Sequence, residues 1–376
     1  MRQDRKRERG TVTPKGSAQR IERLKGSARG TPRVYISAEP QDHRRKSHPV
    51  CETRFGSLYF GKAEDVLGTK SISKKYAGLV QLVFTSPPFP LASGKKYGNL
   101  RGDDYVRWLA GFAKLLKRYV ASNGSIVMEV GNVWEPGTPT MSTSVMKALL
   151  RFLEEGELHL CEEFVWYNPA RLPSPAQWVN IERSRVKDAF TRIWWMSPTE
   201  RPKADNRRIL RPYSSGMEKL IRTGKYNSGM RPSEHGIGHK SFAVDNGGAI
   251  PSNVFGGDEV PSLSNVLKVS NTRSNDRYQL FCRDNSITPH PARMPTEIAE
   301  FFIKFLTDER DIVLDPFAGS NTTGAAAERL KRRWISVEAD WEYIRGAFGQ
   351  FPVGNIQATS PEVLFLRGLP GTPPTS

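Results

Sequence analysis

The chain has 376 residues with a formal net charge of +17, and 38% of its residues are hydrophobic. This composition is typical of a soluble globular protein with one large or two smaller domains. No apolar run approaches the roughly 20 residues that span a bilayer, and the N-terminus lacks the apolar stretch of a signal peptide, so we expect a cytoplasmic protein without membrane contact. The positive charge makes nucleic acid the leading partner class, although RNA-binding proteins share this excess.

The three cysteines, Cys51, Cys161 and Cys282, are odd in number and far apart. No C-x-x-C pair or His/Cys cluster accompanies them. We therefore expect buried thiols, with neither disulfides nor a metal site.

The N-terminal segment 1–48 carries 14 Lys/Arg and 5 Asp/Glu with almost no apolar periodicity. Such a composition predicts a flexible basic arm. The arm is either a solubilising tail or an element that grips DNA phosphates, and the sequence does not decide between these readings.

Order begins with residues 49–196, the first half of the predicted folded domain. A strand at 57–60, a helix at 62–76 and a strand at 79–84 precede the stiff loop "TSPPFP" at 85–90. Two consecutive prolines cannot donate to a sheet ladder, so the strand ends before them. The helix in "DDYVRWLAGFAKLLKRYV" and the strand in "GSIVMEVGN" then complete a βαβ unit, which predicts an α/β fold with a parallel sheet.

Residues 197–289 are rich in Gly, Ser, Asn, Pro and Arg and predict a loop-rich, mostly non-helical insert. Residues 290–355 form the second half of the domain, with helix "PTEIAEFFIKFLTDERD", strand "IVLD", helix "TTGAAAERLKRR" and strand "WISVE". Residues 356–376 are rich in Pro and Gly and predict a flexible tail.

The stretch "DIVLDPFAGSNTTG" places a glycine turn between a strand and a helix, and Glu338 ends the next strand. A close backbone approach at Gly319 and an acid about 20 residues later suit an adenosine-containing cofactor. Neither G-x-G-x-x-G nor G-K-[ST] is present, so a pyrophosphate or a triphosphate is not favoured. S-adenosylmethionine, which has no phosphate, fits the turn; alternatively, Gly319 only turns the chain.

The order "TSPPF" followed by "DPFAGSNTTG" resembles the β group of amino-methylating DNA methyltransferases. The resemblance covers residues 55–348 and is strongest to N4-cytosine modification methylases of the PvuII type. It implies a Rossmann-like methyltransferase fold with a circularly shifted motif order and S-adenosylmethionine as the donor. It also implies double-stranded DNA with a flipped-out cytosine as the substrate, and a cognate restriction endonuclease acting on the same site.

The acceptor loop supplies the candidate catalytic residues Ser86, Pro87, Pro88 and Phe89. The cytosine amine is a poor nucleophile, so the Ser86 hydroxyl and the Pro87 carbonyl would hold its N–H groups, while Phe89 would stack on the extruded base. Adenine-N6 enzymes of the family usually have Asp or Asn where Ser86 stands, which favours cytosine. Methylation at C5 needs a nucleophilic Cys beside a Pro, and this chain has none.

The resemblance also assigns the cofactor-binding residues and places target recognition in the insert. The cofactor candidates are Asp315, Phe317, Gly319, Ser320, Asn321, Thr322, Glu338, His290 and Pro291, with Arg293 nearby. The candidate DNA-binding residues are Arg207, Arg208, Arg211, Arg231, Arg273 and Arg277. Lys62 stands where relatives often have an acidic residue, unless Glu64 or Asp65 substitutes for it.

Three further aromatic residues have less specific readings. Residues 172–178 could line the same cleft as the acceptor loop, although Trp178 is equally compatible with core packing, and we expect Trp194 and Trp195 to be core residues. Two alternative functions remain open: an adenine-N6 DNA methyltransferase, or an inactive DNA-binding regulator with the same fold.

Overall fold

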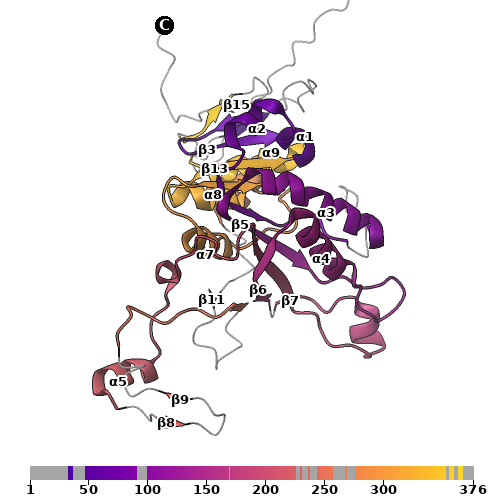
Figure 1. The fold of residues 1–376 in the computed structure, drawn as a ribbon. Coiled ribbons are helices and arrows are strands. Elements are labelled where there is room, and N and C mark those ends of the chain that lie inside the picture. Colours follow the sequence, from indigo (N-terminus) through magenta and orange to yellow (C-terminus); the bar gives the residue numbers. More distant parts are fainter. Residues whose placement is uncertain are drawn as a thin grey trace, which may run out of the picture.

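An 11-stranded mixed sheet organises the described part of the chain (Figure 1). The computed structural model describes residues 33–36, 47–90, 100–168, 170–225, 229–230, 236–237, 244–256, 267–268, 276–352, 355–359 and 363–366. In spatial order the strands are β11 (Leu267–Lys268), β10 (Val254–Gly256), β6 (His159–Tyr167), β7 (Phe190–Ser197), β5 (Val120–Gly131), β4 (Val80–Thr85), β12 (Ile312–Asp315), β13 (Arg333–Glu338), β3 (Gly56–Phe60), β2 (Cys51–Glu52) and β14 (Gln357–Ala358).

The direction of the strands gives the sheet two distinct edges. Strands β3, β13, β12, β4 and β5 pair in parallel, so their carboxyl ends meet at one edge, the carboxyl edge. Strand β7 is antiparallel to both β5 and β6, so β6 runs in the same direction as β5. The loops that follow β4, β5, β6, β12 and β13 therefore all leave at the carboxyl edge, whereas the insert after β7 starts at the opposite, amino edge. The predicted parallel α/β architecture is confirmed, with β7 and β2 as antiparallel members.

Helices cover both faces of the sheet. One face packs against α1 (Ala63–Leu67), α2 (Lys70–Tyr76), α3 (Gly102–Tyr119) and α4 (Ser144–Gly156). The other face packs against α6 (Arg277–Asp284), α7 (Thr296–Leu306), α8 (Thr322–Arg329) and α9 (Trp341–Ala347). In β4, Val83 faces the first helix layer and Phe84 the second, because successive strand side chains point to opposite faces. The sheet is therefore buried on both sides.

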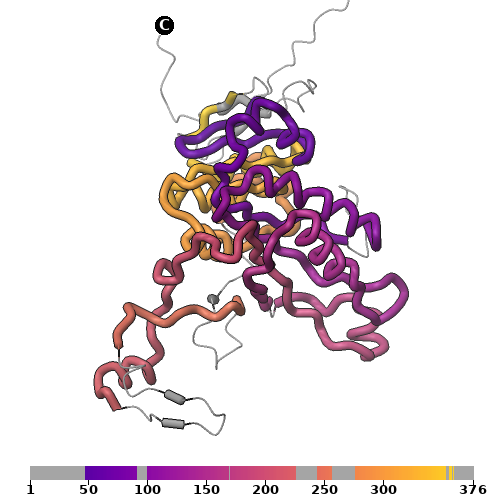
Figure 2. The backbone as a smooth tube through the Cα atoms, in the orientation of Figure 1, coloured from indigo at the N-terminus to yellow at the C-terminus, as the bar shows by residue number. Residues whose placement is uncertain are grey.

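Parts of the chain that are far apart in sequence meet in the centre of the molecule (Figure 2). Strand β4 from the first half lies between β5 and β12 and pairs with both, and β13 pairs with β3. Residues 49–196 and 290–352 thus share one sheet and contribute together to the hydrophobic core on each of its two faces. The Gly-rich turn after β12 and the proline-rich loop after β4 become neighbours at the carboxyl edge.

Most predicted elements of the core agree with the structure, with shifts at their ends. The predicted helix at 62–76 is two helices, since the chain breaks at Gly68 and Thr69. The strand that precedes the acceptor loop, β4, includes Thr85. Trp194 and Trp195 are buried as predicted, whereas Trp178 is only half-buried, in the short π-helix η2 (Gln177–Ile181).

The arm, the insert and the tail contain more regular structure than the sequence predicts. Strand β1 (Arg33–Ile36) pairs antiparallel with β15 (Val363–Leu366), which joins the expected flexible arm and tail. Within the insert lie η3 (Asn206–Ile209), α5 (Ser215–Thr223) and the paired strands β8 (Gly229–Met230) and β9 (Gly236–Ile237). Helix α5 and the β8–β9 pair project away from the sheet (Figure 1), whereas α6 packs on α9 and on η4 (Phe348–Gln350).

Among the described residues, no helix combines the length and the hydropathy that a membrane-spanning segment requires.

Candidate active site

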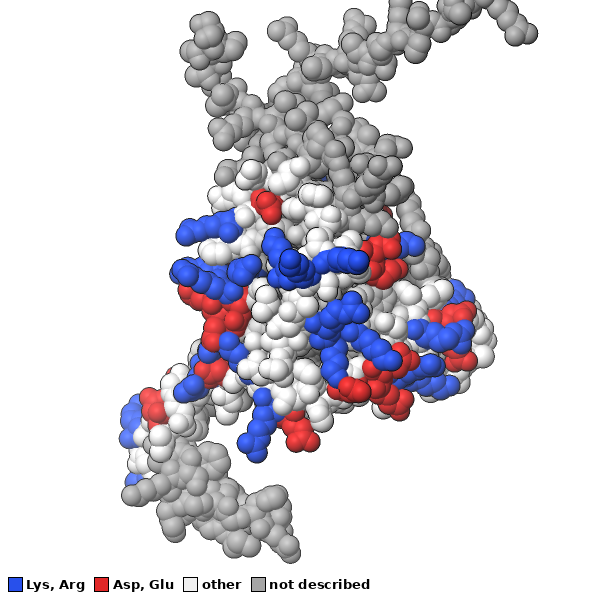
Figure 3. Space-filling model, turned by 45° about the horizontal axis from the view of Figure 1, so that its top comes forward, with Lys and Arg blue, Asp and Glu red and all other residues white. Residues whose placement is uncertain are grey.

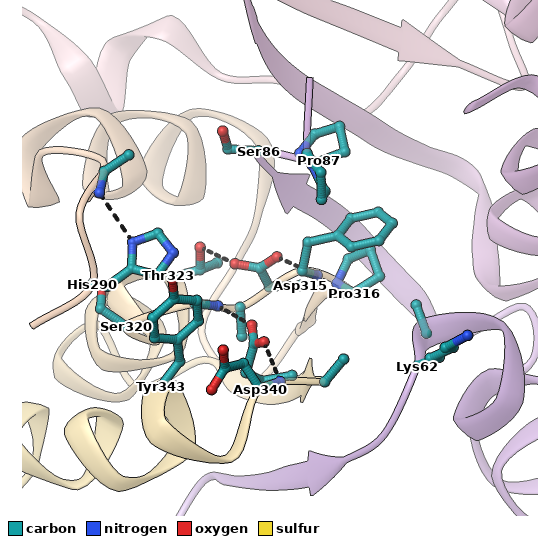
Figure 4. Close-up of a pocket in the computed structure, with 18 of the residues that line it drawn as sticks. Lys62, Ser86, Pro87, His290, Asp315, Pro316, Ser320, Thr323, Asp340 and Tyr343 are labelled. Atoms are coloured by element: carbon teal, nitrogen blue, oxygen red, sulfur yellow. Dashed lines mark hydrogen bonds between the residues drawn. The ribbon is translucent and has the colours of Figure 1, made fainter. Parts of the chain in front are cut away.

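A cavity of about 1190 Å³ opens at the carboxyl edge between the acceptor loop and the glycine turn. Its lining comes from both halves of the domain: Ser86 to Phe89, Tyr105 and Trp108 from the first half, and the turns after β12 and β13 from the second. Figure 4 shows Ser86 and Pro87 on one side, Asp340 and Tyr343 on the other, and Asp315 between them. The two loops singled out in the sequence therefore face each other across one cavity.

The acceptor loop is fixed by contacts with β5. The Ser86 hydroxyl donates a hydrogen bond to the Glu129 carboxylate; Ser86 directly follows β4, and Glu129 lies near the carboxyl end of β5. The Phe89 ring lies against Gly131; a Cβ built there would come within 2.8 Å of the ring, so only glycine leaves room for this contact. The loop thus presents the Ser86 hydroxyl and the Pro87 and Pro88 rings to the cavity.

Glu129 is a buried carboxyl group with several polar neighbours. Burial raises the pKa of Glu129, while the hydrogen bond from Ser86, the nearby Thr191 hydroxyl and the charge of Arg171 lower it in part. A carboxylate with a raised pKa accepts a proton more readily than an exposed one. Glu129 lies 43 residues after Ser86, and the sequence pattern "VMEVGN" alone did not single it out.

Asp315 connects the acceptor strand to the glycine turn. Its Oδ1 accepts hydrogen bonds from the Thr85 hydroxyl at 2.7 Å and from the Phe317 N–H at 3.1 Å, and its Oδ2 accepts from the Thr323 hydroxyl at 2.7 Å. Burial raises the pKa of Asp315 to about 6, although these hydrogen bonds act in the opposite direction. The Asp315 side chain therefore links the end of β4, just before the acceptor loop, to the glycine turn that follows β12.

Glu338 fixes the glycine turn from the neighbouring strand. Its two carboxylate oxygens accept hydrogen bonds from the Gly319 N–H at 2.6 Å and the Asp340 N–H at 2.7 Å. Each oxygen keeps a second lone pair, and the side chain lines the cavity. Burial raises the pKa of Glu338 to about 7, against the backbone hydrogen bonds that lower it. Glu338 can therefore accept two hydroxyl donors of a ligand.

His290 forms the wall of the cavity next to the glycine turn. Its ring meets the Tyr343 ring edge-on at 4.3 Å, and its backbone N–H donates to the Tyr278 hydroxyl at 2.8 Å. Gly319 has a φ of +51°, and a Cβ there would lie 3.0 Å from the His290 Nε2 atom. A side chain at position 319 would therefore be strained and would also crowd the imidazole.

Most predicted cofactor residues line the cavity, but two do not. Asp315, Phe317, Gly319, Ser320, Thr322, Glu338, His290 and Arg293 are part of its lining, whereas Asn321 and Pro291 are not. Asn321 is fully buried and accepts a hydrogen bond from the Ser336 hydroxyl, so its side chain supports the turn from behind. Lys62 and Glu64 both line the cavity, and residues 172–178 do not.

Three of the four predicted DNA-binding arginines that the structure describes have side-chain partners within the protein, whereas the buried Nη2 atom of Arg211 has none. Arg207 pairs with Asp205. Arg208 pairs with Asp205 and Asp308 and donates to the Thr307 carbonyl. Arg211 pairs through its backbone with Ala249, and Arg277 donates to the Phe351 carbonyl. Arg231 and Arg273 lie outside the described residues.

Sequence reasoning missed several lining residues on the second half of the cavity. Asp340 begins α9 as its N-cap, and Trp341 and Tyr343 follow on the first turn. The signal that could have found them is the short distance from Glu338, since a strand end and the next helix start share one edge of the sheet. Among the described residues, no cluster of His, Cys, Asp and Glu could hold a metal ion.

Comparison with known proteins agrees with this geometry. The N6/N4 methyltransferase family, described as DNA methylase, matches residues 80–349. The type II methyltransferase M.PvuII of Proteus hauseri is 41% identical over 328 residues, which are 86% of this chain and 91% of the relative. M.ScaI of Streptomyces caespitosus is 23% identical over 306 residues, 80% of this chain and 83% of the relative.

A solved structure shows the same fold. The PvuII DNA methyltransferase (cytosine-N4-specific) superposes with a TM-score of 0.62 and 35% identity, over 82% of this chain and 91% of that chain. The predicted methyltransferase fold is therefore confirmed. Together with the family match over the catalytic core, these relatives show that the chain belongs to the N6/N4 family of S-adenosylmethionine-dependent DNA methyltransferases.

Proposed function

We propose that this protein transfers a methyl group from S-adenosylmethionine to the N4 amine of cytosine in a short double-stranded DNA sequence. The observation that carries the proposal is the placement of Ser86, hydrogen-bonded to buried Glu129, across one cavity from the glycine turn and Glu338. The sequence relatives support the same target atom, since the PvuII enzyme of similar fold is cytosine-N4-specific.

The residues on the second side of the cavity fit S-adenosylmethionine. The free lone pairs of Glu338 suit ribose hydroxyls, and the absence of a Cβ at Gly319 leaves the turn open beside His290. Phe317 is held by Trp108 and Phe112, with ring centroids 5.7 and 5.2 Å apart, which gives the cavity a rigid apolar floor. The bound sulfonium would supply an activated methyl group with a neutral leaving group.

The acceptor side orients the amine. The hydroxyl of Ser86 already donates to Glu129, so its oxygen lone pairs are available to accept an N–H of the cytosine amine. The carbonyl of Pro87 can accept the second N–H, and the rigid prolines keep both acceptors fixed. Holding both N–H groups in this way localises the nitrogen lone pair toward the methyl group.

The proton released at N4 has a path to Glu129. After transfer, the N4 nitrogen carries one proton too many; the Ser86 oxygen accepts it while the Ser86 hydroxyl proton moves to the Glu129 carboxylate. The raised pKa of Glu129, caused by its burial, favours this transfer. The net products are N4-methylcytosine, a proton and the demethylated cofactor.

The target-recognition region is proposed to lie in residues 197–289, between the catalytic segment 49–196 and the cofactor segment 290–355. Helix α5 and the β8–β9 pair form a projection that could reach along a DNA duplex (Figure 1). The six arginines Arg207, Arg208, Arg211, Arg231, Arg273 and Arg277 remain candidates. The ion pairs of Arg207 and Arg208 favour a structural role for these two.

The surface charge suits a polyanionic substrate. On the face that Figure 3 presents, Lys and Arg side chains form a broad group across the middle of the molecule, with acidic side chains in smaller groups beside them. Protection of host DNA against a cognate restriction endonuclease would follow from such an activity. A cytoplasmic location follows from the same proposal, because chromosomal DNA is the substrate.

The test is to incubate the protein with labelled S-adenosylmethionine and unmodified genomic DNA, digest the DNA to nucleosides and identify the product by mass spectrometry. We expect N4-methylcytosine with the natural protein and none with Ser86→Ala, while Ser86→Ala still binds the cofactor. N6-methyladenine as the product would replace the proposal with adenine methylation, and absence of label with intact cofactor binding would favour an inactive DNA-binding protein.

A further inference from the structure

The segment 170–189, which connects β6 to β7, leaves the sheet beside the acceptor site. Strand β6 runs parallel to β5, so the segment starts at the carboxyl edge. Its base is held there: the Asn132 side chain donates to Asp188 at 2.9 Å, and Arg171 donates to the Phe190 carbonyl at 3.0 Å. Asn132 directly follows Gly131, on which the Phe89 ring lies. Asn132 therefore holds the base of the segment next to Gly131, the residue that the Phe89 ring of the acceptor loop contacts.

The outer part of this segment exposes large apolar side chains. Leu172, Ile181 and Val186 are 82%, 69% and 86% exposed, and these are the three highest values for large hydrophobic residues in the described part of the chain. Scattered apolar residues on a surface need no explanation, but three on one short segment next to an active site indicate a contact surface. Each side chain is available to an incoming partner at no cost to the core.

The charge of the segment favours DNA over a protein as that partner. Exposed cationic side chains at Arg183 and Lys187 alternate with the apolar ones. To bring a cytosine amine to Ser86, a duplex has to lie along the carboxyl edge, where the segment stands. Extruding a base leaves a gap in the stack, and proteins that open DNA commonly fill such gaps with apolar side chains.

We infer that segment 170–189 enters the duplex next to the extruded cytosine, with Leu172, Ile181 and Val186 contacting the bases that the extrusion exposes. Arg183 and Lys187 would contact the flanking phosphates. The inference rests on the proposed function and adds to it the element that stabilises the opened duplex. The cofactor cavity does not include this segment, so changes in it should leave cofactor binding the same.

The experiment compares the triple variant Leu172→Ala/Ile181→Ala/Val186→Ala with the control variant Leu150→Ala/Leu160→Ala. The two control residues are also exposed apolar side chains, 61% and 45%, on α4 and at the amino-edge start of β6. The methylated site of the natural protein is first located in genomic DNA. Two synthetic duplexes then carry this site, with the target cytosine either paired to guanine or opposite an abasic position.

On the paired duplex we expect the triple variant to lose at least about tenfold in kcat/KM, and on the abasic duplex to recover most of it, because extrusion then costs little. The control variant should match the natural protein on both duplexes, and calorimetric binding of S-adenosylmethionine should be equal in all three proteins. Full activity of the triple variant on the paired duplex, or an equal loss on both duplexes, would overturn the inference alone. Failure of the natural protein to methylate cytosine in any DNA would overturn the proposed function, and the inference with it.

Discussion

At the scale of single residues, Ser86 and Glu129 act as one unit because the hydroxyl of the first donates to the buried carboxylate of the second. We predict that Glu129→Gln retains the contact with Ser86 but cannot take up the proton, so kcat should fall by roughly 10²-fold or more. The dissociation constant for S-adenosylmethionine should stay the same, since Glu129 does not line the cavity. Single-turnover methylation and cofactor calorimetry measure the two quantities.

Ser86→Ala provides the matched comparison for this prediction. If the two groups form one path, the double variant should be hardly slower than the slower single variant, because groups that act together are not additive. Multiplicative losses would contradict the path. An undiminished kcat in Glu129→Gln would show that the carboxylate only positions Ser86.

We predict that Glu338 makes cofactor binding depend on pH. Burial raises its pKa to about 7 in the protein without cofactor, and ribose hydroxyls need the ionised carboxylate as acceptor. Affinity should therefore be constant well above pH 7 and fall as the pH drops through 7, by at most about tenfold per pH unit. Calorimetry at pH 6, 7 and 8 measures this.

Glu338→Gln is the control, because the amide does not titrate. We expect this variant to bind the cofactor weakly with a flat pH profile. A natural protein whose affinity does not change between pH 6 and 8 would contradict the assigned role of Glu338.

At the scale of elements, strands β4 and β12 are joined across the active site by Asp315. Replacing Thr85 with Val removes one of the hydrogen bonds to this buried carboxyl with little change in volume, and should lower the free energy of unfolding by roughly 1–3 kcal/mol. Because Thr85 directly precedes Ser86, the same change should lower kcat. Urea unfolding and steady-state kinetics test both effects.

Thr323→Val is the matched change on the cofactor side of the same carboxyl. It should cost similar stability but act on cofactor affinity, since Thr323 lines the cavity in the helix that follows the glycine turn. If both variants changed kcat and cofactor affinity in the same proportion, Asp315 would serve only the stability of the core.

The elements of the core were predictable from sequence because each carries a local signal. Proline pairs, the glycine turn and the apolar faces of α3 and α7 all appear within a few residues. Contacts between distant elements carry no such signal: Glu129 meets Ser86 only because β5 pairs with β4. The same holds for the turn after β13, where Asp340 enters the site through the fold.

At the scale of the whole molecule, charge counts predicted the partner class but not the placement of individual cations. Arg208 lies with Lys203, Asp308 and Asp311 at the amino edge, opposite the cavity, in a group of ion pairs. The sequence around Arg208 is that of a DNA-contacting loop. Its partner Asp308 lies shortly before β12, and only the fold brings the two residues together. The residues next to Arg208 in the sequence therefore do not reveal its ion pairs.

The role of the positive charge on the N-terminal arm can be tested by deletion. Residues 1–32, which precede β1, hold 10 Lys/Arg and 3 Asp/Glu, so their removal leaves the β1–β15 pair intact while deleting much of the net charge. If the arm binds phosphates, its deletion should reduce the slope of log affinity against log salt by about 0.9 for each phosphate that the arm neutralises. The affinity for S-adenosylmethionine should not change, because the cavity lining starts at Gly61. Fluorescence anisotropy with a labelled duplex at several salt concentrations measures the slope, and an unchanged slope would assign the arm to solubility instead of DNA binding.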